Sequence, residues 1–141
     1  MEQFIEFIGN HWILSTSFAA LLVAFFYNEV KRSGQALSPQ QVVNLVNQQR
    51  ALVLDVRDAN EFGSGHITDA VNIPHGSLQN RITELEKYKE RPVVVVCKMG
   101  QHSGSMCTLL KKAGFTNVSR LRGGVSTWRA ESLPLVKGRS K

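Results

Sequence analysis

Short apolar blocks alternate with stretches of helical spacing along the chain from about residue 37 to residue 136. Blocks of four to six mostly aliphatic residues are typical of strands that are buried on both faces of a parallel sheet. We predict strands at 51–56, 70–73, 93–96 and 117–121, with helical spacing after Ser38, Ser77, Ser103 and Gly124. This alternation predicts an α/β domain, in which a doubly wound parallel sheet carries helices on both faces.

Several of these helices have recognisable ends or faces. Ser38, Pro39 and Gln41 form the pattern of an N-cap serine, a first-turn proline and a glutamine that closes a capping box. Gly114 stands where a glycine commonly ends a helix, because it adopts the left-handed conformation. From residue 77 to residue 89 the apolar positions recur at helical spacing, at Leu78, Ile82, Leu85 and Tyr88. The last pattern predicts one helix over 77–89.

An uncharged apolar run precedes this domain. Counting from Ile8 to Tyr27 gives about the twenty residues that a helix needs to cross the hydrocarbon core of a bilayer. Trp12 and Tyr27 bracket the uncharged part, as aromatic residues do at membrane interfaces. The serine and threonine hydroxyls in the run can bond to the helix backbone, which makes them tolerable there. The run predicts a transmembrane helix at about residues 9–28.

Two alternatives to a membrane anchor remain open for this run. A cleaved signal peptide would begin with basic residues, but only Glu2 and Glu6 precede the run, and the small-residue pattern at 34–36 lies beyond Lys31 and Arg32. A helix buried in a protein core would show a polar face, whereas this run is apolar all round. The sequence therefore favours a single-pass anchor.

The charges on either side of the run predict its direction. Acidic residues precede it and Lys31 and Arg32 follow it, so the positive-inside rule places the following domain in the cytoplasm. We divide the chain into an N-terminal region with the transmembrane helix (1–30), a linker (31–36), the α/β domain (37–136) and a basic tail (137–141).

Composition excludes several classes of function. The net charge of +6 could indicate nucleic-acid binding, but the excess lies largely beside the apolar run and in the tail, without interleaved aromatic residues. We expect no nucleic-acid partner. The two cysteines, Cys97 and Cys107, cannot make a disulfide scaffold, and no Cys or His spacing is that of a metal site, so we predict neither a metal nor a cofactor.

Cys97 is the best candidate for chemistry, because it stands directly after the four valines at 93–96 and shortly before a helical pattern. The carboxyl ends of parallel strands are where α/β sheets bind ligands. Backbone N–H groups and the helix dipole stabilise negative charge there, and the thiolate is the nucleophilic form of cysteine. The N–H groups of residues 99–103 can form an anion-binding concavity, with Gly100 permitting the turn and Lys98 adding a charge. We therefore predict a reactive sulfur, which suits a reducing compartment.

Three motifs in this order resemble the rhodanese family. The first runs from Asp55-Val56-Arg57 through Gly65-His66-Ile67 to Ala70-Val71-Asn72-Ile73-Pro74. The loop from Cys97 to Ser103 resembles the family's active-site loop, and Gly123-Gly124-Val125-Ser126-Thr127-Trp128 resembles its closing signature. From Asp55 to Trp128 they span about half of the 141 residues.

The resemblance implies a single doubly wound α/β domain, whose cysteine becomes a persulfide while it passes sulfane sulfur from a donor to an acceptor. The expected donor is thiosulfate or another small sulfur compound, and the expected acceptor is a thiol or a protein. A span before one such domain is similar to the membrane-anchored rhodaneses of bacteria, which implies the bacterial inner membrane. We expect the soluble domain to be monomeric.

Each candidate site residue has a predicted role. Cys97 is the catalytic residue, and Asp55 and Arg57 support the loop by pairing with each other. We expect Cys107 to pack in the core and His66 to be structural. The predicted substrate-binding residues are Lys98, Met99, Gly100, Gln101, His102 and Ser103.

His102 departs from the family pattern, because many active members carry arginine at this position. Histidine is only partly charged at neutral pH and lacks the two-pronged guanidinium, so we expect weaker thiosulfate binding but an intact persulfide step.

Two other classes of function compete with a sulfurtransferase. A phosphatase of the same fold needs a longer loop with an arginine six positions after the cysteine, where this chain has Ser103. A non-catalytic interaction module at the membrane remains the alternative. The retained Cys97 and the glycine-bearing loop argue against that alternative, whereas His102 is compatible with it.

Overall fold

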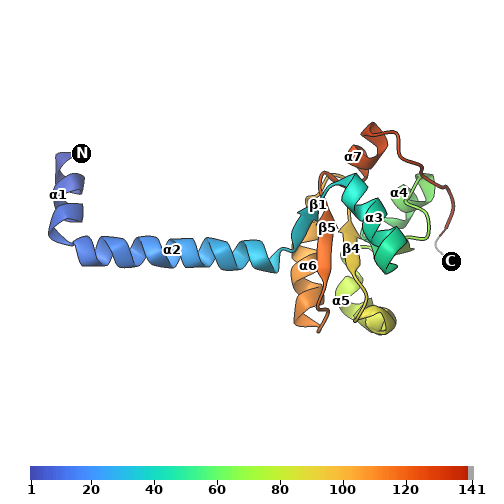
Figure 1. The fold of residues 1–141 in the computed structure, drawn as a ribbon, viewed down its shortest axis with the longest axis horizontal. Helices are drawn as coiled ribbons and strands as arrows, with labels where there is room; N and C mark the ends of the chain where they lie inside the picture. Colours follow the sequence, from blue (N-terminus) through green and yellow to red (C-terminus); the bar gives the residue numbers. More distant parts are fainter. Residues whose placement is uncertain (140–141) are drawn as a thin grey trace. The chain divides into compact units, whose positions relative to one another are not determined.

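The computed structural model describes residues 1–139, and the chain forms two compact units, Met1–Lys31 and a second unit that begins at Arg32. The first unit holds α1 (Glu2–Asn10) and nearly all of α2 (Trp12–Arg32), with His11 interrupting the helix between them (Figure 1).

Helix α2 is long and apolar enough to cross a membrane by length and composition. At about 1.5 Å per residue its 21 residues extend about 32 Å, close to the roughly 30 Å of a hydrocarbon core. The hydroxyls of Thr16 and Ser17 donate to the carbonyls of Trp12 and Ile13 at 2.8 and 2.7 Å, as expected for polar residues in such a helix. The helix begins and ends later than the predicted 9–28, because His11 leaves the helical conformation and α2 continues through the basic pair.

The second unit contains a five-stranded parallel sheet with the order β1-β5-β4-β2-β3. Its strands are β1 (Gln35–Leu37), β2 (Leu52–Asp55), β3 (Val71–Asn72), β4 (Val93–Val96) and β5 (Val118–Leu121). The central strand β4 pairs with β2 so that Val96 lies opposite Asp55. Parallel pairing brings the carboxyl ends of all these strands to one edge of the sheet. The predicted doubly wound fold is confirmed.

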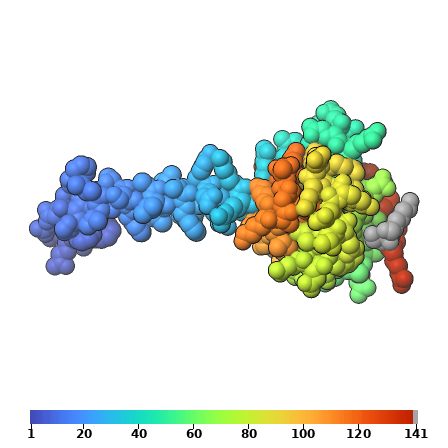
Figure 2. Space-filling model, turned by 90° about the horizontal axis from the view of Figure 1, so that it is seen from below, coloured from blue at the N-terminus to red at the C-terminus, as the bar shows by residue number. Residues whose placement is uncertain are grey.

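Helices cover both faces of the sheet (Figure 1). On one face lie α3 (Pro39–Gln49), α4 (Ala59–Ser64) and α7 (Gly124–Ala130), and on the other α5 (Leu78–Arg81), the 3-10 helix η1 (Ile82–Tyr88) and α6 (Ser103–Lys112). Figure 2 shows the second face, where orange α6 lies beside the yellow-green α5–η1 segment. Val93 and Val95 join the core under α6, whereas Val94 and Val96 join the core under α7. All four valines are fully buried, which confirms a strand that is covered on both faces.

The predicted helix ends are confirmed at α3 and α6. The Ser38 hydroxyl accepts a hydrogen bond from the Gln41 N–H, and the Gln41 side chain accepts one from the Ser38 N–H, which completes the capping box. Gly114 follows the C-cap of α6 with a φ of +102°.

Residues 31–36, expected to be a linker, instead contain the end of α2 and most of β1. This edge strand pairs with β5. Only Leu37 of its three residues is buried, and a strand with one buried side chain does not show the apolar block from which strands were predicted. Residues beyond the predicted domain boundary at 136 also contact the domain, because the Gly138 N–H donates to the Gly63 carbonyl. Residues 140–141 of the predicted tail lie outside the described residues.

The single helix predicted over 77–89 is instead one turn of α-helix followed by the 3-10 helix η1. The apolar residues Ile82, Leu85 and Tyr88 are each three positions apart, which matches the three residues per turn of a 3-10 helix.

Candidate active site

Cys97 lies directly after β4, at the carboxyl edge of the sheet, and is only 2% exposed. Its Sγ accepts a hydrogen bond of 2.8 Å from the Gly100 N–H. The turn that aims this N–H at the sulfur places Gly100 at a φ of +95°, a conformation that favours glycine. The predicted concavity therefore has at least one N–H directed at the thiol, which stabilises negative charge on the sulfur.

The rest of the loop leads into α6. The Ser103 hydroxyl donates to the Gly100 carbonyl at 3.0 Å, and Ser103 is fully buried at the first position of the helix. Lys98, Met99 and Gln101 are exposed. Ser103 therefore fixes the loop from inside, while those three side chains face solvent.

The start of α7 holds the other side of the loop. The Val125 N–H donates to the Cys97 carbonyl at 2.9 Å, and the Ser126 N–H donates to the Lys98 carbonyl at 3.0 Å. Gly124, at a φ of +62°, approaches so closely that a Cβ there would overlap the Cys97 carbonyl oxygen and the Lys98 carbonyl group. Sequence reasoning used the glycine pair as a helix start and as part of a family signature, and missed that Gly124 packs against the Cys97 and Lys98 carbonyls.

Asp55 and Arg57 form the expected ion pair. The Arg57 Nη2 lies 2.7 Å from the Asp55 Oδ2, and both side chains are at least 95% buried. Arg57 Nη2 also donates to the Gly65 carbonyl, while the Asn72 amide donates to the backbone carbonyls of both charged residues. The pair therefore ties the carboxyl end of β2 to the segment after α4, beside the strand that leads into the Cys97 loop.

His102 is the N-cap residue of α6, and its ring stacks on that of His75 at a centroid distance of 4.2 Å. The His75 N–H donates to the Val56 carbonyl, which holds this residue at the same edge of the sheet. Both side chains are exposed. Sequence reasoning missed His75, although its place directly after Pro74 of the first motif was a usable signal.

Comparison with known proteins identifies the family. The model of the rhodanese-like domain matches residues 38–131, about two thirds of the chain. The chain belongs to the rhodanese family. It is 36% identical to the uncharacterized protein YibN of Escherichia coli K12 over 143 residues, covering 99% of this chain and 100% of that protein.

A relative with a named activity and a solved structure match the domain. The thiosulfate sulfurtransferase GlpE of Pseudomonas savastanoi is 36% identical over 92 residues, covering 65% of this chain and 85% of that protein. A crystal structure of a rhodanese-related protein from Thermoplasma volcanium superposes with a TM-score of 0.66 at 26% identity, covering 72% of this chain and 97% of the other. The rhodanese fold and the family resemblance predicted from the motifs are thus confirmed.

The second cysteine of this rhodanese lies in the core. Cys107 has no exposed surface, and its thiol donates to the Ser119 carbonyl at an Sγ–O distance of 3.6 Å. Burial raises the pKa of the Cys107 thiol to about 12, against a smaller opposing effect of Lys111 and Arg120. A thiol in this state is a poor nucleophile near neutral pH, which agrees with the predicted packing role.

His66 also has structural contacts in the rhodanese domain. Its Nδ1 lies 2.8 Å from the Phe62 carbonyl oxygen, and its ring stacks on that of Phe62 at 3.7 Å. Within residues 1–139, His, Cys, Asp and Glu side chains form no group of three that could hold a metal ion.

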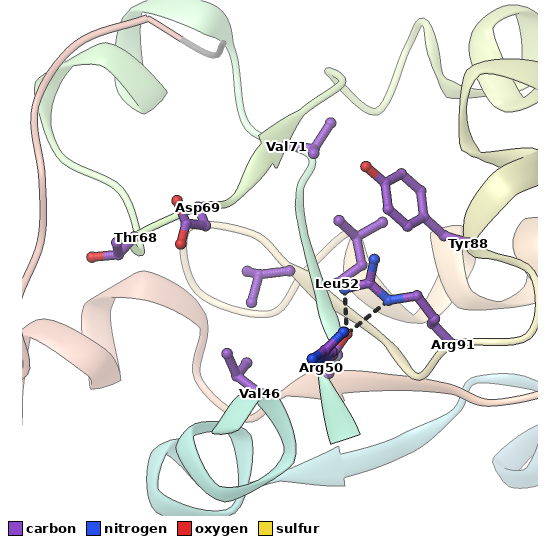
Figure 3. A pocket seen from close by; sticks show the side chains of 10 residues that line it. Val46, Arg50, Leu52, Thr68, Asp69, Val71, Tyr88 and Arg91 are labelled. Carbon is purple, nitrogen blue, oxygen red and sulfur yellow. Dashed lines mark hydrogen bonds between the residues drawn. The ribbon is translucent and has the colours of Figure 1, made fainter. Parts of the chain in front are cut away.

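A separate cavity, of about 290 Å³, does not include Cys97 in its lining, and Figure 3 shows the side chains that surround it. It surrounds the amino end of β2, where Arg91 donates to the Arg50 carbonyl and places its guanidinium near the Tyr88 ring. Parallel strands put this cavity at the other end of β4 from the thiol, so it does not belong to the catalytic site.

We predict that Cys107 gives the stability of this rhodanese a specific pH dependence. Below pH 9, the ordinary pKa of the thiol, folded and unfolded chains both keep this proton. Between about pH 9 and 12 only the unfolded chain loses it, so the free energy of unfolding falls by about 1.4 kcal/mol per pH unit from this group. Denaturant unfolding of wild type and Cys107→Ala across this range should give curves that converge as pH rises. Parallel curves would contradict the prediction.

Proposed function

We propose that this protein is a sulfurtransferase that carries sulfane sulfur as a persulfide on Cys97. The observation that carries the proposal is the hydrogen bond from the Gly100 N–H to the Cys97 Sγ, within a loop held between β4, α6 and α7. An anion-stabilising N–H aimed at a strand-end sulfur suits a thiolate before transfer and a persulfide after it. The named activity of the GlpE relative supports the same reaction class.

The reaction proceeds in two half-reactions. In the first, the Cys97 thiolate attacks the outer sulfur of thiosulfate, a new S–S bond forms, and sulfite leaves with the electron pair of the broken bond. In the second, a thiophilic acceptor attacks the outer sulfur of the persulfide, and Cys97 leaves as a thiolate. Sulfur is conserved through both steps, and neither consumes an oxidant.

The loop side chains provide charge for an anionic donor. Lys98, the residue after Cys97, adds an ammonium group, and His102 stands at the N-cap of α6. In this proposal the N–H groups of Met99, Gln101 and Ser103 extend the concavity around Gly100. The Asp55–Arg57 pair fixes the carboxyl end of β2, beside the strand that leads into the loop.

We further propose that α2 anchors the protein in the bacterial inner membrane as a single-pass helix, with the rhodanese domain in the cytoplasm and monomeric. The length and apolar composition of α2 support this topology, and so does the position of Lys31 and Arg32 at its carboxyl end. A cytoplasmic location also keeps Cys97 reduced and available for transfer.

The Cys97→Ser variant should lose sulfur transfer and keep its fold, because serine is close in size but lacks the nucleophile. Cys107→Ser should keep most of the activity. The measurement is thiocyanate formation from thiosulfate and cyanide, with thermal unfolding of each variant as the control for stability. Activity that survives in Cys97→Ser would exclude the proposed reaction. Equal loss in both variants at unchanged stability would instead indicate a relay between two cysteines.

We expect His102→Arg to increase kcat/KM for thiosulfate about tenfold or more. Arginine adds a permanent charge and a planar fork for two oxygens of the donor, and such a contact contributes about 1.5–3 kcal/mol. Its guanidinium can stack on His75 as the present ring does. Steady-state kinetics of wild type and variant with thiosulfate measure this gain. An unchanged kcat/KM in the variant would mean that His102 does not contact the donor.

The topology has its own test in bacterial cells. The full-length protein should stay in the membrane fraction after a carbonate wash, with its amino terminus intact. Added protease should digest the rhodanese domain in inverted membrane vesicles and leave it intact in spheroplasts. Recovery of a shortened protein that starts near Leu37 outside the cytoplasm would instead support a cleaved signal peptide.

A further inference from the structure

A second cavity, of about 200 Å³, adjoins the catalytic loop. It lies between α4, α7 and Lys98, and the polar side chains that line it are those of Arg57, Glu61, Ser64, Lys98, Ser126 and Arg129. We call it the basic pocket. Its lining is continuous with the catalytic loop, because the Val125 and Ser126 N–H groups that hold the Cys97 and Lys98 carbonyls come from residues of the same lining.

The charges of the basic pocket favour an anion. Three cationic side chains line it, against the single carboxylate of Glu61. Asp55 already balances the charge of Arg57 outside the lining. In the part of the chain that the structure describes, Lys98 and Arg129 form no salt bridge, so the lining retains a net positive charge.

The Arg57 guanidinium offers one free nitrogen to the pocket. Arg57 uses Nε and Nη2 to bind Asp55 and the Gly65 carbonyl, which leaves Nη1 without a hydrogen bond among residues 1–139. This nitrogen is not among the buried atoms that lack a partner in that part of the chain, so it is accessible. It can therefore donate to an oxygen of a bound anion.

The position of the pocket indicates the size of its ligand. Cys97 packs with the core under α6, whereas α4 and α7, which form the pocket, cover the opposite face of the sheet. A ligand whose anionic group lies several bonds from its reacting sulfur therefore suits both places better than thiosulfate, whose two sulfurs are bonded directly.

We propose that the basic pocket binds the carboxylate of the sulfur acceptor, and that the preferred acceptor is a thiol acid with its carboxylate several bonds from the sulfur. The proposal rests on the proposed persulfide chemistry. The acceptor thiol loses its proton to solvent and attacks the outer sulfur of the Cys97 persulfide. A new S–S bond forms on the acceptor, the old one breaks, and its electron pair stays on Cys97 as the thiolate.

A matched pair of acceptors tests the proposal. The full-length protein in detergent is first loaded with sulfur from thiosulfate and freed of excess donor. Transfer from Cys97 to 6-mercaptohexanoate and to 6-mercaptohexanol is then followed in single turnovers, since the two thiols differ only in the distant charge. We expect the acid to react about tenfold faster than the alcohol at low concentrations.

Substitutions in the basic pocket test whether it causes the preference for the acid over the alcohol. Arg129→Gln should reduce the ratio of acid to alcohol rates several-fold, and Arg129→Lys should restore part of it. Lys112→Gln, a loss of the same charge at the far end of α6, should keep the wild-type ratio. Equal rates for the two thiols in the wild type, or an unchanged ratio in Arg129→Gln, would overturn the proposal.

Failure of the proposed function would be visible separately. If Cys97 takes up no sulfur from thiosulfate, the persulfide chemistry fails before any acceptor is added. The pocket is then tested by hexanoate, which has the carboxylate without the thiol. Hexanoate should shift the NMR signals of Val125 and Ser126 in the wild type, and shift them less in Arg129→Gln. If tens of millimolar hexanoate cause no shift, the proposed carboxylate site is excluded, whether or not Cys97 takes up sulfur.

Discussion

The contact between the start of α7 and the peptide groups of Cys97 and Lys98 is the constraint on which the active site depends. Only a glycine at position 124 lets the two segments approach this closely, and the next two N–H groups then hold the two carbonyls. With these two carbonyls held by α7, the chain turns through Gly100 and directs its N–H at the sulfur. Residues almost thirty positions apart therefore shape one loop around Cys97.

Local surroundings give the two cysteines different chemistry. Cys97 ends a buried strand and receives a hydrogen bond from the backbone, which stabilises negative charge on its sulfur. Cys107 lies in the apolar core, where burial raises the pKa of its thiol to about 12, and its S–H donates a hydrogen bond to a carbonyl. The backbone group that each sulfur meets also differs, because it is an N–H for Cys97 and a C=O for Cys107.

Strong local signals made much of this fold predictable. Four consecutive valines identified the central strand, and Ser38 with Gln41 identified a helix start that the structure reproduces in both hydrogen bonds. Strand β1 was missed because an edge strand of three residues with one buried side chain has almost no hydrophobic pattern. The helix expected over 77–89 differs because spacings of three and four residues were treated as equivalent.

The site was predictable only where its residues are adjacent in sequence. Cys97, Gly100 and the Asp55–Arg57 pair lie where the motifs placed them, although their roles in turnover stay predictions. The stacking of His75 on His102 depends on tertiary packing, and so does the placement of Arg129 and Lys98 around one cavity. Local sequence patterns carry no signal for such contacts.

The most direct test of the central claim is the intact mass of the purified protein after incubation with thiosulfate. A persulfide carrier should gain the mass of one sulfur atom, and fragmentation should locate that atom on Cys97. Added cyanide should then remove it and restore the original mass. An unchanged mass, or a gain located on Cys107, would contradict the account.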